Sequence, residues 1–346
     1  MSSVPISKTY WTEIDTLDSN LVAAYWRQGS VYQIDDADRV EAGQLFLEHD
    51  CPWQAVDIAG IILHDGQELD VDFVKNALDA ACRSVNTYNS VHHTEYAVSE
   101  LLKWLEDEAP DDPVLPGLEF QFFDFLHDHD PSNALYRALG SSPADFVQLV
   151  RSVYDRDSDE AEGSNISRKQ KEAYFRRSLN VLNEWSILPG SREDGTADGN
   201  RLLDWIKQVR DLLAQCDCLD VGDSQIGHVL SCSPDDTDGI WPAMIVRDAV
   251  EEVASKKMDS GIATGKLNRR GVSSREEFGG GGQEWGLSNQ YSEMARQLAS
   301  RWPRTAAILR NIAVEYEGEA QYFDTRAERL TPTRSEERRV GKECRS

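Results

Sequence analysis

The amino-acid sequence predicts an all-α protein built from antiparallel helix pairs in two lobes. Apolar residues recur every three or four positions through most of the chain, which is the period of a helix that buries one face. Alternating runs of β-branched residues between turn residues, the pattern of strands, are nearly absent. Stacked helix pairs bury faces that no single pair could bury alone. The pattern therefore favours an α-solenoid of the HEAT or TPR kind, although no fixed period identifies a repeat class.

The first lobe is predicted over residues 1–156. Val40 to Glu48 and Pro52 to Leu63 form its clearest helix pair, and Pro52 suits a first helical turn because its φ is already helical. Two further apolar stripes predict helices downstream, and their members are Ala97, Leu101, Trp104 and Leu105 in one and Leu115, Leu118, Phe122 and Phe125 in the other.

A polar, charged segment without an apolar stripe, residues 157–170, is predicted to link this lobe to a second one over 171–333. In NRLLDWIKQVRDLLAQC one stripe predicts a helix, with Asn200 expected as its N-cap; its members are Leu202, Ile206, Val209 and Leu213. Two other stripes predict helices further on, formed by Val246, Ala249, Val250 and Val253, and by Thr305, Leu309, Ile312 and Tyr316 after Pro303.

Composition narrows the classes of partner. The 346 residues include 61 acidic and 36 basic side chains, for a net charge of −25. Such a chain repels phosphates, so nucleic acid and anionic membrane surfaces are unexpected partners. The longest apolar stretch, around Ala59 to Leu63, is far shorter than the roughly 20 residues of a membrane helix. Sparse cysteines and the absence of a signal-peptide pattern favour a cytoplasmic protein. Helical stacks expose broad grooves, so we expect the partners to be proteins or other domains of a longer chain.

One cluster has metal-like spacing. Cys216 and Cys218 form C-x-C, and His228 and Cys232 follow as H-x3-C, so three thiolates and one imidazole could form a tetrahedral zinc site. The competing interpretation, buried thiols packed as small core residues, is favoured because C-x-C is a less usual ligand spacing than C-x2-C. We therefore expect no cofactor and no catalytic residues, with a metal-dependent enzyme fragment as an alternative.

Other candidate motifs are weaker still. His127 to Asp130 and the pair His92-His93 read as solvated helix ends. Gly279 to Gly282 reads as a flexible joint, and Gly261 to Leu267 fails the P-loop spacing. The basic run Lys266 to Arg275 could bind an anion but is typical of a solvated loop. Aromatic side chains that would suit an interface if exposed, but that core packing explains better, are Trp11, Trp26 and Trp53.

A helix-turn-helix is the second alternative. Asp223 to Ser231 resembles its first helix and Ala243 to Ala254 its second, but the acidic SPDDTDG connection between them is too long. The second helix carries Arg247 together with Asp248, Glu251 and Glu252, a poor charge balance for contact with phosphates.

Several segments between Glu100 and Glu317 carry a family resemblance, namely LLKWLEDE, LEFQFFDFL, LYRALGSSPADFVQLVRSVY, DSQIGHVL, DGIWPAMIVRDAVEEVAS, the NRRGV run and RWPRTAAILRNIAVEYE. They resemble the C-terminal helical region of a family of very large bacterial multidomain proteins, some labelled as helix-turn-helix regulators or antitoxins. The resemblance implies no catalytic residues. It favours a non-catalytic helical scaffold or protein-interaction region belonging to a longer protein, with a DNA-binding regulator or antitoxin as the alternative.

The last thirteen residues, Arg334 to Ser346, are basic in an otherwise acidic chain. The string RSEERRVGKEC resembles the translation of a common sequencing-library adapter. We expect residues 334–346 to be adapter-derived, and no function is assigned to them.

Overall fold

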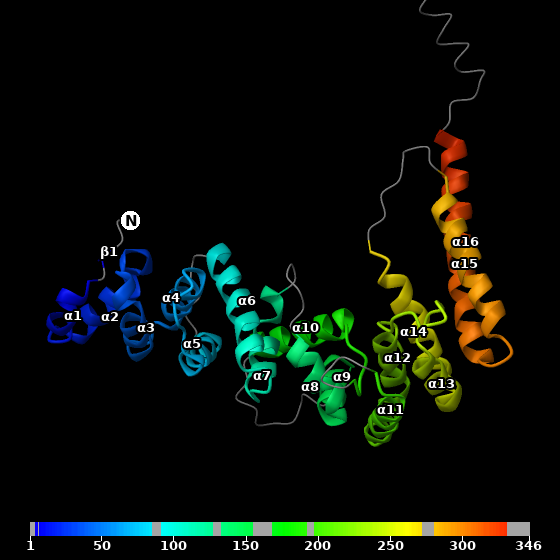
Figure 1. Cartoon of the computed structure of the whole chain (residues 1–346), viewed down its shortest axis with the longest axis horizontal. Coiled ribbons are helices and arrows are strands. Elements are labelled where there is room, and N and C mark those ends of the chain that lie inside the picture. Colours follow the sequence, from blue (N-terminus) through cyan, green and yellow to red (C-terminus); the bar gives the residue numbers. More distant parts are fainter. Residues whose placement is uncertain are drawn as a thin grey trace, which may run out of the picture. The chain divides into compact units, whose positions relative to one another are not determined.

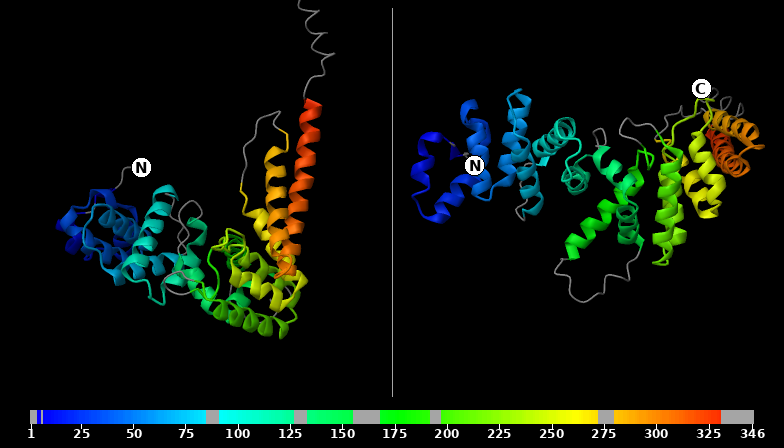
Figure 2. Two further views of the ribbon diagram at one scale, coloured as in Figure 1. Left: turned by 45° about the vertical axis from the view of Figure 1, so that its right-hand side comes forward. Right: turned by 60° about the horizontal axis from the view of Figure 1, so that its bottom comes forward.

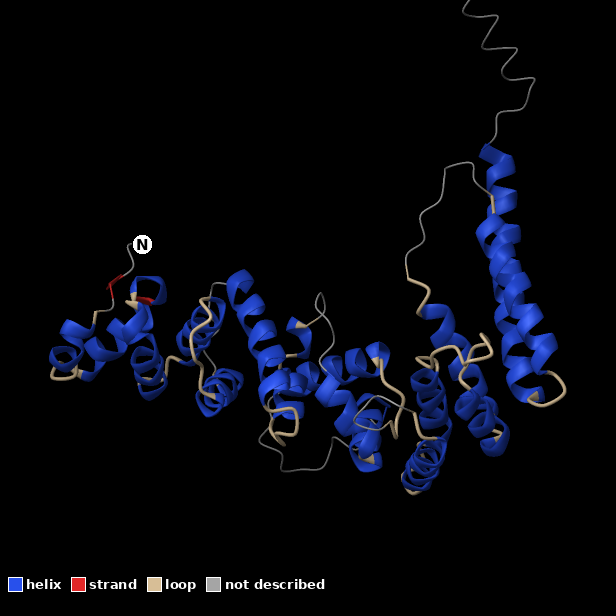
Figure 3. Cartoon of the chain, in the orientation of Figure 1, coloured by secondary structure: helices blue, strands red, loops and turns tan. Residues whose placement is uncertain are grey.

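The computed structural model describes residues 4–5, 7–84, 91–126, 133–154, 168–191, 197–271 and 280–330. Within these ranges it contains sixteen α-helices, three short 3-10 helices and two two-residue strands, β1 (Val4–Pro5) and β2 (Gly29–Ser30), which pair in parallel (Figures 1 and 3). The all-α prediction is confirmed. The solenoid stays a prediction.

The chain divides into two compact units, Met1–Ala138 and Leu139–Ser346, within helix α8 (Asn133–Ser141). This division precedes the predicted linker, of which 157–167 lie outside the described residues and 168–170 begin α10 (Arg168–Glu184). Helix α9 (Pro143–Tyr154), expected in the first lobe, packs in the second unit. Its Phe146 explains why, because the ring lies edge-on to Trp185 and Trp205 at centroid distances of 5.7 and 4.9 Å.

In the first unit, α4 (Pro52–His64) is the central helix and contacts α3 (Arg39–Glu48), α5 (Val71–Arg83) and α6 (Val91–Glu108). The predicted pair is confirmed almost to the residue, since α3 spans Arg39–Glu48 and α4 spans Pro52–His64 with proline in its first turn. Of the predicted stripe Leu115, Leu118, Phe122 and Phe125, both leucines lie in α7 (Leu115–Gln121), Phe125 lies in η3 (Phe123–Phe125), and Phe122 lies between the two elements. The remaining elements are α1 (Lys8–Ile14), α2 (Ser19–Gln28), η1 (Val31–Gln33), η2 (Asp36–Asp38), α5 (Val71–Arg83), α6 (Val91–Glu108), α7 (Leu115–Gln121) and η3 (Phe123–Phe125).

The three N-terminal tryptophans belong to the core of this unit. Trp26 is fully buried and stacks on His49 at 4.9 Å between ring centroids. Trp11 is buried beside it, and half-buried Trp53 packs against Phe122. The core-packing interpretation of these residues is therefore confirmed.

The second unit also contains α11 (Gly199–Ala214), α12 (Leu219–Leu230), α13 (Met244–Val253), α14 (Lys256–Asn268), α15 (Gly282–Leu298) and α16 (Pro303–Leu330). The apolar stripe predicted on α11 is fully buried. The prediction of Asn200 as its N-cap is wrong: the carboxylate of Asp198 accepts hydrogen bonds from the amides of Asn200 and Arg201, because the helix begins at Gly199.

Helices α12 and α14 approach closely because glycines line their contact. A Cβ added at Gly227 would lie 2.1 Å from the carbonyl oxygen of Met258, and one at Gly261 would lie 2.1 Å from that of Ser224. Backbone therefore meets backbone here, with no room for even a methyl group.

Helices α15 and α16 lie side by side as a hairpin (Figures 1 and 2). At one end of the hairpin, the Asp324 carboxylate accepts hydrogen bonds from the Gly281 amide at 2.7 Å and the Trp285 indole at 2.8 Å. Near the start of α16, the Glu251 carboxylate of α13 accepts from the amides of Arg304 and Thr305 at 2.9 and 3.0 Å.

Candidate functional site

The four candidate metal ligands, Cys216, Cys218, His228 and Cys232, do not form a metal site. Cys216 donates its thiol hydrogen bond to helix carbonyls of α11, and the Nε2 atom of His228 lies 3.3 Å from the Asn183 carbonyl oxygen. Among the residues that the structure describes, which include all four candidates, no group of three or more His, Cys, Asp or Glu side chains could hold a metal ion.

Burial sets the chemistry of two of these groups. It raises the pKa of the Cys232 thiol to about 11, so the thiol stays protonated at neutral pH. It also lowers the pKa of His228, which lies close to Arg269. A neutral, half-buried thiol is consistent with the favoured interpretation of Cys232 as a packed residue.

The would-be recognition helix, α13, presents no basic surface. Arg247, its single basic residue, is fully buried, donates to both carboxylate oxygens of Asp238 at 2.6 and 2.9 Å, and packs on Trp302. Asp248 accepts from the Trp302 indole, and Glu251 holds the start of α16. This arrangement gives no support to the DNA-binding interpretation.

In the part of the basic run Lys266 to Arg275 that the structure describes, the cationic side chains contact other residues of the same unit. Lys266 lies over the Trp241 ring at 4.5 Å, Arg269 donates to the Ser231 hydroxyl at 2.8 Å, and Arg270 pairs with Glu284. Residues 272–275 lie outside the described residues.

Described glycines of the two glycine motifs pack between helices, and the histidine motifs cannot be placed within the described residues. Gly261 and Gly265 lie in α14 against α12, and Gly281 packs on Ala320, whereas Gly279 lies outside the described residues. The cluster His127 to Asp130 and the side chains of His92 and His93 also lie outside them.

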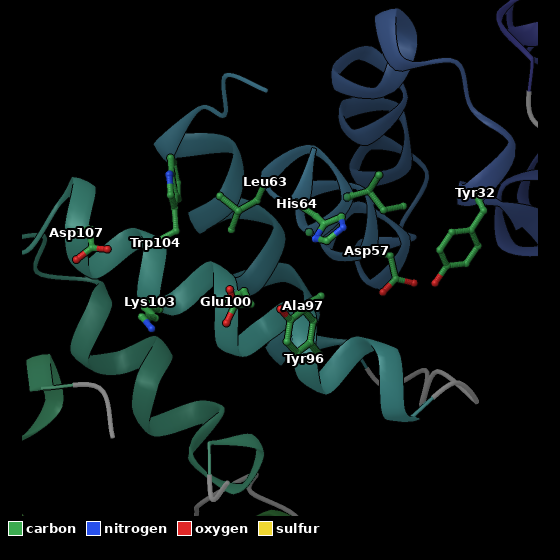
Figure 4. Close-up of a pocket in the computed structure, with 12 residues that line it drawn as sticks. Tyr32, Asp57, Leu63, His64, Tyr96, Ala97, Glu100, Lys103, Trp104 and Asp107 are labelled. Carbon is green, nitrogen blue, oxygen red and sulfur yellow. The ribbon is translucent and has the colours of Figure 1, made fainter. Parts of the chain in front are cut away.

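A groove in the first unit, which we call the α4–α6 groove, is the strongest candidate. It encloses about 590 Å³. Its walls come from α4, α6 and the short helix η1, and its lining combines aromatic, acidic and small apolar side chains (Figure 4). The lining residues are Tyr32, Asp57, Gly60, Ile61, Leu63, His64, Tyr96, Ala97, Glu100, Lys103, Trp104 and Asp107.

Helical periodicity explains how the groove forms. On α6 the lining residues Tyr96, Glu100, Lys103 and Asp107 are spaced by four, three and four, so they share one face of the helix. That face extends about 16 Å at 1.5 Å per residue. Helices α4 and α6 pack closely at the lining of the groove, since a Cβ at Gly60 would lie 2.9 Å from the Ala97 methyl group.

Charge and aromatic surface coincide in the groove. Among its described lining residues, the carboxylates of Asp57, Glu100 and Asp107 outnumber the single ammonium group of Lys103. The rings of Tyr32 and Tyr96 are more than half exposed, whereas Asp57 is 5% exposed. Burial, and then the charge of Asp57, raises the pKa of the Tyr32 phenol. The groove thus offers π faces and negative charge to a cation.

Sequence reasoning missed this site because its walls come from helices far apart in the chain. Asp57 and Gly60 lie inside the predicted helix Pro52 to Leu63, and the polar Asp57 in an apolar run was its only local sign. Trp104 belongs to a predicted core stripe, but it is half-buried and lines the groove.

Comparisons with known proteins identify no relative: no family model, no curated protein and no solved structure matches the chain. Within the described ranges, no helix combines the length and apolar character that a bilayer-crossing segment needs.

Proposed function

We propose that this chain is a non-catalytic, helical protein-interaction region, and that its α4–α6 groove binds a positively charged segment of a partner protein. The observation that carries the proposal is the coincidence of exposed tyrosines and three carboxylates in one groove. Peptide-binding surfaces commonly lie between helices of this kind, where aromatic side chains give affinity and charge gives specificity.

Electrostatics favours a cationic polypeptide over the other partner classes. Glu100 and Asp107 both line the groove (Figure 4), and the whole chain carries a net charge of −25. A nucleic acid would be repelled by both. A basic segment would be attracted over a long range and then held at short range by the groove acids.

A binding titration tests the proposal with the full chain. Two fluorescent peptides with the same apolar residues serve as probes. The basic peptide contains several lysines and a single arginine, and the acidic peptide has glutamate at each of those positions. Fluorescence anisotropy should report binding of the basic peptide alone. The double reversal Glu100→Lys with Asp107→Lys should weaken that binding about tenfold or more, since each lost rim contact is worth roughly 0.5–1 kcal/mol and each new like charge adds repulsion.

The matched control separates the groove from general attraction to an acidic protein. Glu68 is exposed in the same unit but lies outside the groove, so Glu68→Lys, combined with the reversal of a second exposed acid, Asp72→Lys, makes the same change in net charge. If both double variants weaken binding equally, the attraction is non-specific and the proposal is wrong.

A further inference from the structure

We infer that the end of the α4–α6 groove formed by Tyr32 and Asp57 is a subsite for one arginine side chain of the bound segment. This inference rests on the proposed function and makes it more specific. It names the chemical group recognised and the two side chains that recognise it.

The geometry of this end differs from the rest of the groove. Asp57 lies on α4 with an exposed fraction of only 5%, whereas the Tyr32 ring on η1 is 65% exposed. The Tyr32 hydroxyl points toward the Asp57 carboxylate, and both line the same groove (Figure 4). A ligand that enters here therefore meets an exposed aromatic ring with a carboxylate beyond its hydroxyl edge.

The low exposure of Asp57 makes its charge more effective than that of the groove rim. Glu100 and Asp107 are more exposed than Asp57, so water and salt screen their charges. The charge of a buried carboxylate is screened much less, and a cation that covers the opening removes still more water. The strongest single contact in the groove is therefore expected at Asp57.

A guanidinium group fits these two features better than an ammonium group. It is planar, so it can lie flat on the Tyr32 ring, and its N–H groups lie in the same plane and can point toward Asp57 at the same time. An ammonium group is a compact, strongly hydrated charge that loses more on leaving water. The remaining lining supports the rest of the segment, with Ile61 and Ala97 as an apolar floor.

A double-mutant cycle on the full chain tests the subsite. The probes are the basic peptide with its single arginine moved along the sequence, and the same set with citrulline, which has the same shape but no charge. For the best position, arginine to citrulline should weaken binding to the wild-type chain about tenfold, the size of one desolvated charge-assisted contact. When the chain carries Asp57→Asn, replacing the peptide's arginine by citrulline should change the affinity by less than about twofold.

Because Asp57 is buried, its replacement could unfold the unit, so a second variant is needed. Tyr32→Leu changes an exposed ring and should also reduce the preference for arginine over citrulline, whereas Tyr10→Leu, at a 54% exposed ring outside the groove, should not. Circular dichroism melts establish that each variant is folded.

The outcomes separate the two claims. If the basic peptide binds and the Glu100 and Asp107 reversals weaken it, but the arginine preference survives in Asp57→Asn and Tyr32→Leu, the subsite is wrong and the proposed function stands. If no basic peptide binds the wild-type chain, both are wrong. If the preference for arginine over citrulline is lost in both Asp57→Asn and Tyr32→Leu, the result supports both the subsite and the proposed function.

Discussion

The close contact between α12 and α14 makes Gly227→Ala a sensitive test of the packing described above. The new Cβ would lie 2.1 Å from the Met258 carbonyl oxygen and 2.8 Å from the Ile262 amide nitrogen. Both obstacles are backbone atoms of a helix, so they cannot rotate aside as a side chain would. The two helices must therefore separate by about 1 Å to restore a normal contact distance.

The expected cost follows from two opposing terms. Overpacking a core contact costs about 3 kcal/mol when backbone must move, because the separation also weakens contacts around the buried side chains Met258 and Ile262. Alanine regains about 1 kcal/mol over glycine in a helix interior. Gly227→Ala should therefore destabilise the second unit by about 2 kcal/mol.

Gly286 supplies the matched control, because it lies within α15 and a methyl group added there would have no neighbouring atom within 4 Å. Gly286→Ala should show only the higher helix propensity of alanine, because no overpacking opposes it, and should stabilise the folded chain by up to about 1 kcal/mol. Urea unfolding followed by circular dichroism measures both changes, and hydrogen exchange assigns the loss to α12 and α14. If both variants shift the unfolding midpoint in the same direction, the close-contact argument fails.

Three further predictions concern ionisable groups. Asp238→Asn should destabilise by about 2 kcal/mol in urea unfolding, a value discounted for the partial exposure of Asp238, because buried Arg247 loses its carboxylate; no change would contradict this. Hydrogen bonding to Arg247 lowers the pKa of Asp238 from 3.8 to about 2. The folded chain therefore binds fewer protons than the unfolded chain between these values, and stability should fall as the pH drops through them in the wild type but less in Asp238→Asn. Burial raises the pKa of Cys51 and Cys232 to about 11, so iodoacetamide should label both far more slowly in the folded chain than in urea, as mass spectrometry can measure; equal rates would contradict their burial.

Local patterns in the sequence were enough to predict the helices. The α11 stripe is buried as expected, and the prolines at 52 and 303 begin α4 and α16. These features depend on neighbours within one or two helical turns, which the sequence displays directly. The N-cap of α11 shows the limit of this reasoning, since Asp198 and Asn200 are both good caps and only the backbone decides between them.

The candidate site depended on information that the sequence does not display. The groove needs α4 beside α6, and more than twenty residues separate the end of α4 at His64 from the start of α6 at Val91. Arg247 illustrates the same limit. Its neighbours in the sequence gave no sign that it is buried, but Asp238 and the carbonyl oxygen of Pro242 both accept hydrogen bonds from its buried guanidinium group. Tertiary contacts decide whether such a charge faces solvent or the interior.

The carboxylate of Glu251 has a consequence for how the hairpin of α15 and α16 is positioned. Helix α16 begins after Trp302, whose indole is a hydrogen-bond donor only and cannot accept from the first amides of the helix. The Glu251 carboxylate of α13 accepts from the amides of Arg304 and Thr305 instead. The start of a 28-residue helix is therefore fixed by a side chain more than fifty positions earlier. An insertion in the turn between α15 and α16, ahead of Trp302, should therefore lengthen the connection without shifting this helix, because its register is set across space and not along the chain alone.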